Sequence, residues 1–212
     1  MIVVSYAYSD ADGEFLVRLA RKTVDEYVTL GEKPPIPPDT PEHLKEESGV
    51  FVTLNSIIGT RVSLRGCIGR PYPSQPLVEA TIDSTVDAAV NDPRFPPVTP
   101  SELDSILVEL SVLTPPVKIE YKNPKELLTR VKVGRDGLIT QRGLWRGLLL
   151  PQVPVEWGWD TREFLEHTCS KAGLSPDLWM DPKTEFMSFQ AEIFGEKTPR
   201  GEIVRNPKHP RT

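Results

Sequence analysis

Apolar residues between positions 10 and 30 recur every three to four positions, which is the spacing of an amphipathic helix. Ser9 or Asp10 is placed to cap the start of this helix, and Gly31 is placed to end it. A second stretch with many small and apolar residues, 76–91, is also typical of a helix. The first hundred residues are therefore predicted to contain two helices, one near each end.

Alternating and β-branched stretches predict strands between and after these helices. The first two, 49–55 and 60–68, are close enough to form a hairpin through 56–59. Later strands are predicted over 105–113, 117–121, 145–150 and 187–194, and 133–140 is predicted to be a turn that leads into a strand. Helices are expected over 124–131 and 160–171. Because helices and strands mix without regular βαβ alternation, the chain is predicted to be an α+β protein.

The hexapeptide Leu64–Gly69 carries the candidate chemistry. Alternate side chains of a strand point to opposite faces, which predicts one face with Leu64, Gly66 and Ile68 and another with Arg65 and Cys67. A neighbouring cation favours the thiolate, which is the reactive form of cysteine. Cys67 is therefore a candidate nucleophile or redox thiol, and Arg65 is a candidate for orienting an anionic or carbonyl group.

The alternative for Cys67 is that it is a small buried hydrophobic residue, as most free cysteines are. A nucleophilic thiol usually has a base within hydrogen-bond reach. The chain has only three histidines, His43, His167 and His209, and none of them is placed by sequence beside Cys67. Gly66 and Gly69 permit the close approach of a ligand or of another backbone segment. The alternative is that they form a bulge or a tight junction.

Arg65 and Arg94 form a second candidate group. Two guanidinium groups near a cleft can hold a carboxylate or a phosphate. The alternative is an internal ion-pair network, for which Asp92, Asp104 and Glu109 offer the anions. The full predicted ligand-binding set is Leu64, Arg65, Gly66, Cys67, Ile68, Gly69, Asp92 and Arg94.

Composition narrows the possible functions. The net charge of −5 argues against a dedicated nucleic-acid binder, because phosphate neutralisation needs clustered positive charge. Two cysteines are too few for a disulfide framework. No apolar stretch is long enough to span a membrane, and the first eight residues lack the basic region of a signal peptide, so a cytoplasmic location is expected. Twenty-two prolines, about twice the usual proportion, indicate a thermophilic source.

No metal or phosphate-loop motif is present, so no metal site and no cofactor are predicted. A carboxylate site for Mg²⁺ stays an alternative, because acidic residues are abundant and such a site needs few protein ligands. The four tryptophans are concentrated in the C-terminal third, where they either pack in a core or form an aromatic surface for a partner. They are Trp145, Trp157, Trp159 and Trp179.

Five stretches together resemble the AMMECR family and follow its order. They are Leu64–Gly69, Asp92–Pro97, Leu110–Thr114, Gly134–Leu138 and Leu149–Val153. The resemblance extends over about 10–205. Some members of the family have a histidine where this chain has Asp136, so a scheme that needs a histidine there as base or ligand does not transfer to this protein.

The resemblance implies two unequal α+β lobes, each with an antiparallel, partly mixed sheet flanked by helices, and a cleft between them. The larger lobe is expected to combine 1–70 with 133–212, and the smaller lobe to be an insertion over 71–132. The resemblance also directs the polar side chains of the hexapeptide toward that cleft. The predicted function is the binding of a sizeable ligand or macromolecular substrate there, whether or not a reaction follows.

The alternative is a protein-interaction module without catalysis, in which the hexapeptide strand is structural. Family members are often encoded beside, or fused to, a Memo-like protein and a radical-SAM protein. The resemblance therefore implies these two proteins as partners in one pathway. The family has no established activity to carry over.

Overall fold

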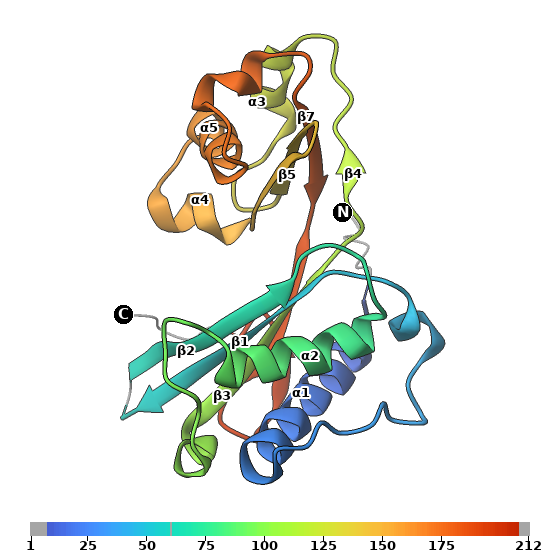
Figure 1. Ribbon diagram of the computed structural model, residues 1–212, viewed down its shortest axis with the longest axis vertical. Coiled ribbons are helices and arrows are strands. Elements are labelled where there is room, and N and C mark those ends of the chain that lie inside the picture. The colour runs from blue at the N-terminus through green and yellow to red at the C-terminus, as the bar shows by residue number, and fades with distance from the viewer. Residues whose placement is uncertain (1–7, 60, 208–212) are drawn as a thin grey trace, which may run out of the picture. The chain divides into compact units, whose positions relative to one another are not determined.

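The computed structural model describes residues 8–59 and 61–207 (Figure 1). The N-terminal residues considered for a signal peptide, 1–7, lie outside the described residues, as does His209. The chain divides into two compact units, and each contains helices and its own antiparallel sheet. The α+β fold class predicted from the sequence is confirmed.

The first unit comprises the described parts of Met1–Leu113 and Glu192–Thr212, and the second unit is Thr114–Ala191. These bounds differ from the lobes expected from the family resemblance. Residues 71–113 belong to the first unit because the helix and strand they form pack on, and pair with, the hairpin that contains the hexapeptide. Residues 133–191 belong to the second unit because their strands pair with one another.

The sheet of the first unit is built on the predicted hairpin. Its strand order is β2-β1-β3-β8-β9. The strands are β1 (Val50–Ile58), β2 (Arg61–Arg70), β3 (Ile106–Leu113), β8 (Ala191–Glu196) and β9 (Ile203–Arg205). Both hairpin strands run further than predicted, so residues 56–58 belong to β1 and the turn follows at Gly59. The hexapeptide therefore lies on β2, at one edge of the sheet.

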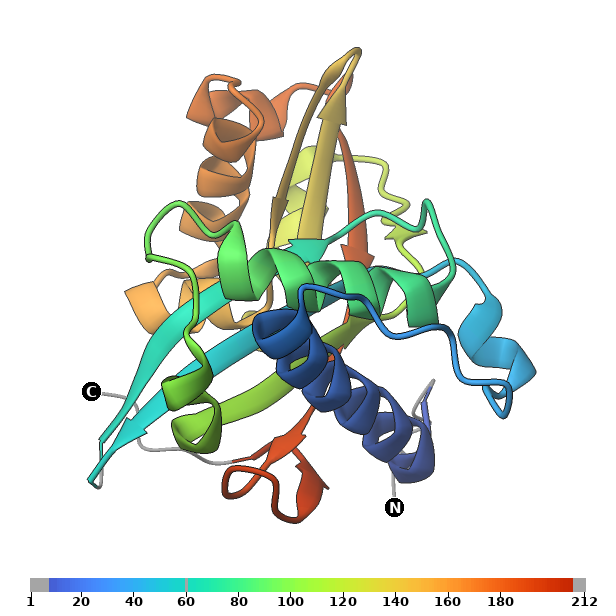
Figure 2. The ribbon, with the colours of Figure 1, turned by 60° about the horizontal axis from the view of Figure 1, so that its bottom comes forward.

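Two helices cover one face of this sheet, α1 (Asp10–Leu30) and α2 (Leu77–Val90) (Figure 2). Helix α1 begins with a capping box: the Asp12 amide donates to the Ser9 hydroxyl at 3.1 Å, and the Ser9 amide donates to the Asp12 carboxylate at 2.8 Å. Gly31 ends α1 with a φ of 75°, as predicted. The buried side of β1 presents Val50, Val52 and Leu54 to these helices, and this contact makes the core. Two 3₁₀ helices complete the unit, η1 (Glu42–Lys45) and η2 (Pro100–Ser105).

The second unit has a four-stranded sheet in the order β4-β7-β5-β6. Its strands are β4 (Val117–Lys118), β5 (Gly137–Arg142), β6 (Trp145–Leu149) and β7 (Glu185–Phe189). Its helices are η3 (Pro124–Glu126), α3 (Leu127–Arg130), α4 (Gln152–Trp157), α5 (Thr161–Lys171) and η4 (Pro176–Met180). A separate core, which includes Leu138, Phe164 and Phe186, lies between the sheet and these helices.

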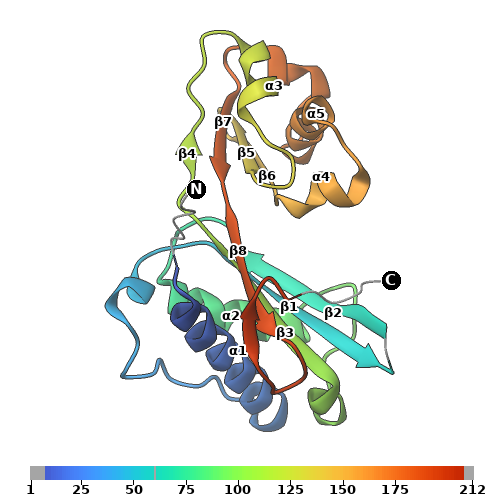
Figure 3. The same ribbon diagram turned by 180° about the vertical axis from the view of Figure 1, so that it is seen from behind.

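Two features of the fold differ from the predicted pattern. The predicted strand 187–194 is two strands, β7 and β8, which Gln190 separates and which belong to different sheets (Figure 3). Helix α4 was not predicted, because Pro151 was interpreted only as the residue that ends the strand over 145–150. Pro151 and Pro154 lie at the start of α4, where a missing N–H breaks no helical hydrogen bond. No helix in the described part of the chain is long and apolar enough to cross a membrane.

Candidate functional site

The hexapeptide strand contains a bulge at Arg65. Gly66 lies opposite Leu54 and Leu64 lies opposite Asn55, so Arg65 has no counterpart on β1. A bulge inserts one residue and breaks the two-residue alternation of a strand. The simple alternation that predicted a shared face for Arg65 and Cys67 therefore stops at Arg65. Leu64, predicted to share an apolar face with Gly66 and Ile68, is 39% exposed.

Arg65 binds the carboxylate of Glu102, a partner that was not predicted. Its Nε donates to Glu102 Oε1 at 2.7 Å, and its Nη2 donates to Glu102 Oε2 at 3.2 Å. Glu102 is the third residue of η2 and also accepts the Thr99 amide in a capping box. The hydrogen bond from Arg65, supported by the Thr99 amide, lowers the pKa of Glu102 to about 2. Arg65 therefore anchors η2 to the edge strand.

Asp92 and Arg94 hold the free edge of β2 at Cys67. The Cys67 amide donates to Asp92 Oδ2 at 2.8 Å, and Arg94 Nη2 donates to the Cys67 carbonyl at 3.2 Å. Arg94 also binds the Asp92 carboxylate, with Nη2 to Oδ2 at 2.6 Å. This pairing with Arg94 holds the pKa of Asp92 far below its usual value. The two side chains thus occupy the backbone amide and carbonyl of Cys67, to which a further strand would otherwise bind at this edge.

The Cys67 thiol lies in a row of polar side chains across three strands. Cys67 is opposite Thr53, and Thr53 is opposite Glu109 on β3. The Thr53 hydroxyl donates to Cys67 Sγ at 3.2 Å. Burial raises the pKa of Cys67, and the charges of Asp92 and Glu109 add to this, while the Thr53 hydrogen bond and Arg94 oppose it. Cys67 is therefore a neutral thiol near pH 7.

Neither described histidine forms a hydrogen bond with this thiol. His43 Nε2 is 2.9 Å from Asp12 Oδ1, and the ring of His167 stacks on Trp159 with 3.8 Å between centroids. The arginine whose charge lowers the pKa of Cys67 is Arg94, whereas Arg65 was predicted for that role.

The glycines of the hexapeptide allow close packing. A Cβ on Gly66 would lie 2.0 Å from the carbonyl oxygen of Ala88 on α2. A Cβ on Gly69 would lie 2.4 Å from the Phe51 ring. Both distances are far below van der Waals contact, so β2 approaches its neighbours as it does only because these residues lack side chains. Of the two alternatives for these glycines, the contacts favour a tight junction.

Two buried donors beside the bulge have no acceptor among the described residues. They are Nη1 of Arg65 and Nδ2 of Asn55. Asn55 is 2% exposed and lies opposite Leu64, the residue before Arg65. Buried donors are almost always hydrogen-bonded, since an unpaired one costs about 1–3 kcal/mol. The sequence gives no signal for Asn55, because its burial depends on the packing of the sheet.

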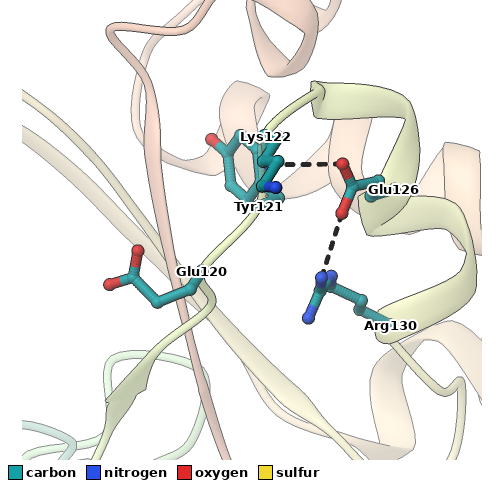
Figure 4. Close-up of a pocket in the computed structure, with 5 residues that line it drawn as sticks. All are labelled: Glu120, Tyr121, Lys122, Glu126 and Arg130. Atoms are coloured by element: carbon teal, nitrogen blue, oxygen red, sulfur yellow. Dashed lines mark hydrogen bonds and ion pairs between the residues drawn. The ribbon is translucent and has the colours of Figure 1, made fainter.

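The second unit holds pockets of its own. One of about 530 Å³ is lined by Glu120, Tyr121, Lys122, Glu126 and Arg130 (Figure 4). Glu126 accepts the Lys122 amide at 3.2 Å and binds Arg130 at 2.9 Å, so the central carboxylate of this pocket is already bound by its neighbours (Figure 4).

Asp136, also in the second unit, closes a turn. Its carboxylate accepts the Lys132 amide at 2.8 Å and both Nε and Nη2 of Arg135 at 2.7 Å. Asp136 is 3% exposed, which favours a structural role for this turn. Among residues 8–59 and 61–207, no cluster of three or more histidine, cysteine or acidic side chains is arranged to hold a metal ion.

The state of the Cys67 thiol predicts a slow alkylation reaction. In a Cys169→Ser background, we expect iodoacetamide to label Cys67 with a pH midpoint above that of a free cysteine, because burial and two carboxylates favour the neutral thiol. Glu109→Gln removes one of these charges and is expected to lower the midpoint. Arg94→Gln removes the favourable cation and is expected to raise it. A midpoint at or below pH 7 in the parent would contradict the described environment.

The AMMECR1 family matches residues 17–194 of this chain. A protein from Thermococcus gammatolerans is 59% identical over 203 residues, which cover 95% of this chain and 98% of that protein. A protein from Methanopyrus kandleri is 52% identical over 193 residues, covering 91% and 92% respectively. The sources of these relatives agree with the thermophilic source that the high proline content indicates.

The crystal structure of an uncharacterized protein from Pyrococcus horikoshii has the same fold. It superposes with a TM-score of 0.85 at 55% sequence identity, and the match covers 96% of this chain and all of that one.

Proposed function

This chain belongs to the AMMECR1 family, and on that premise we propose that it is a binding protein. Its ligand carries a carbonyl or carboxylate group and binds beside the bulge of β2. The observation that carries this proposal is the pair of buried donors, Arg65 Nη1 and Asn55 Nδ2, that have no acceptor among the described residues. The expected cleft between two lobes stays a prediction.

The chemistry of the donors selects the class of ligand. An amide nitrogen and a guanidinium nitrogen donate hydrogen bonds and accept none, so their partner must supply acceptor oxygens. Backbone carbonyls of a peptide and carboxylates both do so, and a guanidinium binds carboxylates especially well. A peptide or a modified macromolecule with such groups therefore fits this site better than an apolar ligand.

The remaining groups of the hexapeptide support a fixed surface more than a reaction centre. Glu102 occupies two nitrogens of Arg65, and Asp92 occupies Arg94. Cys67 is neutral, and neither of the two described histidines is hydrogen-bonded to it. The second candidate function is therefore that of an interaction module in which the hexapeptide is purely structural. The close packing of Gly66 against the Ala88 backbone supports this function. Catalysis by Cys67 has weaker support than either.

The proposed partners are a Memo-like protein and a radical-SAM protein, because the family resemblance links all three in one pathway. The acceptor groups that the site needs occur on any extended polypeptide segment. We therefore expect either partner to present such a segment, or to deliver a substrate that contains one.

Two substitutions test the proposed site. Asn55→Leu removes a buried donor while nearly keeping its volume, so we expect unfolding free energy to stay equal or rise by about 1 kcal/mol. Arg65→Lys keeps the positive charge but removes Nη1. Ligand-observed NMR with succinate and with a blocked tripeptide should detect binding to the parent, and weaker binding to both variants.

The outcomes separate the candidates. A loss of about 2 kcal/mol in Asn55→Leu would mean that the amide makes a structural hydrogen bond, and the site proposal would fail. A different set of results would support the interaction module instead. In that case Asn55→Leu is stable, the parent binds neither small probe, and the parent still binds a purified Memo-like or radical-SAM protein. Arg18→Lys, an exposed arginine on α1, serves as the matched control because it lies in a surface ion pair with Glu14.

A further inference from the structure

A pocket of about 440 Å³ in the second unit is distinct from the site on β2. Helix α5, the 3₁₀ helix η4 and the segment of η3 and α3 line it. Its apolar residues are Leu128, Trp179 and Met180. Its charged residues are Lys125, Arg162, Glu166 and Asp177. The pocket therefore combines an apolar surface with two cations and two anions.

The charges of this pocket are not paired with one another. Arg162 and Glu166 are four residues apart on α5, a spacing at which opposite charges usually attract. No ion pair joins them, and within the described residues none involves Lys125 or Asp177. The Arg162 guanidinium instead lies 5.9 Å from the centroid of the Trp179 ring, in the range of a cation–π contact. Asp177 accepts a hydrogen bond from the Ser175 hydroxyl.

The apolar surface of the pocket is anchored in the core. Trp179 is 3% exposed and packs in the same core as Phe164 and Leu165 of α5. Met180 is 39% exposed, and its flexible thioether side chain can adapt to different apolar shapes. The base of the pocket is therefore rigid at Trp179 and adaptable at Met180.

We propose that this pocket binds a small zwitterion with an apolar side chain, of the class of a free hydrophobic α-amino acid. Lys125 and Arg162 supply donors for its carboxylate. Glu166 and Asp177 accept hydrogen bonds from its ammonium group. The apolar side chain lies against Trp179 and Met180. Two cations balanced by two anions give the pocket little net charge, so a purely anionic or purely cationic ligand gains less from it.

The test compares three probes that share an aromatic body. L-Phenylalanine has both charges, 3-phenylpropionate lacks the ammonium group, and phenethylamine lacks the carboxylate. Titrations of the full chain by NMR should give saturable binding of L-phenylalanine, with a Kd about tenfold or more below that of either comparator. Equal binding of 3-phenylpropionate, or no binding of L-phenylalanine at millimolar concentration, would overturn the proposal.

Substitutions locate the binding. Arg162→Gln and Glu166→Gln are each expected to weaken L-phenylalanine binding about tenfold, because each removes one charged partner of the zwitterion. Lys171→Gln and Glu120→Gln make matched charge changes in the same unit, outside the residues that line this pocket, and should leave the Kd unchanged. A Kd that shifts equally in all four variants would reflect general electrostatics and contradict the assigned pocket. The site on β2 involves none of these residues, so this result is independent of the function proposed there.

Discussion

Gly66→Ala is expected to destabilise the first unit by about 3 kcal/mol, at the upper end for overpacking. The new Cβ would lie 2.0 Å from the Ala88 carbonyl oxygen and 3.1 Å from its carbon. Both atoms belong to the backbone of α2, so no side-chain rotation relieves the clash. Either α2 moves away from β2, which opens the core, or β2 shifts in register.

Urea unfolding followed by circular dichroism measures this loss. Tryptophan fluorescence provides an internal comparison, because all four tryptophans lie in the second unit. Gly31→Ala is the matched control: its φ is 75° but nothing lies within 4 Å of its Cβ, so the expected cost is only about 1 kcal/mol. If Gly66→Ala costs no more than Gly31→Ala, the close approach of α2 to β2 is wrong.

Arg21→Met is expected to destabilise the first unit by about 3–5 kcal/mol, because it leaves a buried carboxylate without its cation. Arg21 on α1 binds Glu196 on β8 through Nε at 2.9 Å and Nη2 at 2.5 Å. Glu196 is 2% exposed. Arg21 Nη2 also donates to the Ile106 carbonyl at 2.6 Å, and Glu196 accepts the Val108 amide at 3.0 Å. One ion pair thus joins α1, β3 and β8.

A double substitution separates the lost ion pair from the lost packing. Arg21→Met with Glu196→Gln removes both charges, while the glutamine oxygen still accepts the Val108 amide. We expect the double variant to recover more than half of the lost stability. An additive effect of the two substitutions would mean that the buried charge is not the source of the loss. Arg18→Met, which breaks an exposed pair on the same helix, should cost under about 1 kcal/mol.

Local sequence patterns predicted the elements of the first unit well. Helix α1 and its caps, and the β1–β2 hairpin, were readable because their signals lie within a few residues of one another. The family was also readable, since its five stretches occur in order. The pattern failed where one strand-like run, 187–194, serves two sheets, because periodicity carries no information about which sheet a strand joins.

The candidate site was predicted in part. Arg94 and Asp92 were both placed in the predicted ligand-binding set, and in the structure they form an ion pair. This pairing was readable because the two residues are only two positions apart. Glu102 was missed as the partner of Arg65, although the Thr99 to Glu102 capping box is visible in the sequence. Nothing local indicates that η2 lies against β2, so the ion pair between residues 37 apart had no sequence signal.

The sequence by itself determined the α+β class, the family and the helices whose caps and periodicity are local. Only the tertiary structure decided what the hexapeptide does. A one-residue bulge at Arg65 breaks the alternation that predicted a shared face for Arg65 and Cys67, and a bulge is a property of two paired strands. Burial likewise sets the state of Cys67, since a thiol between carboxylates in a packed sheet stays neutral although arginines are near it in sequence.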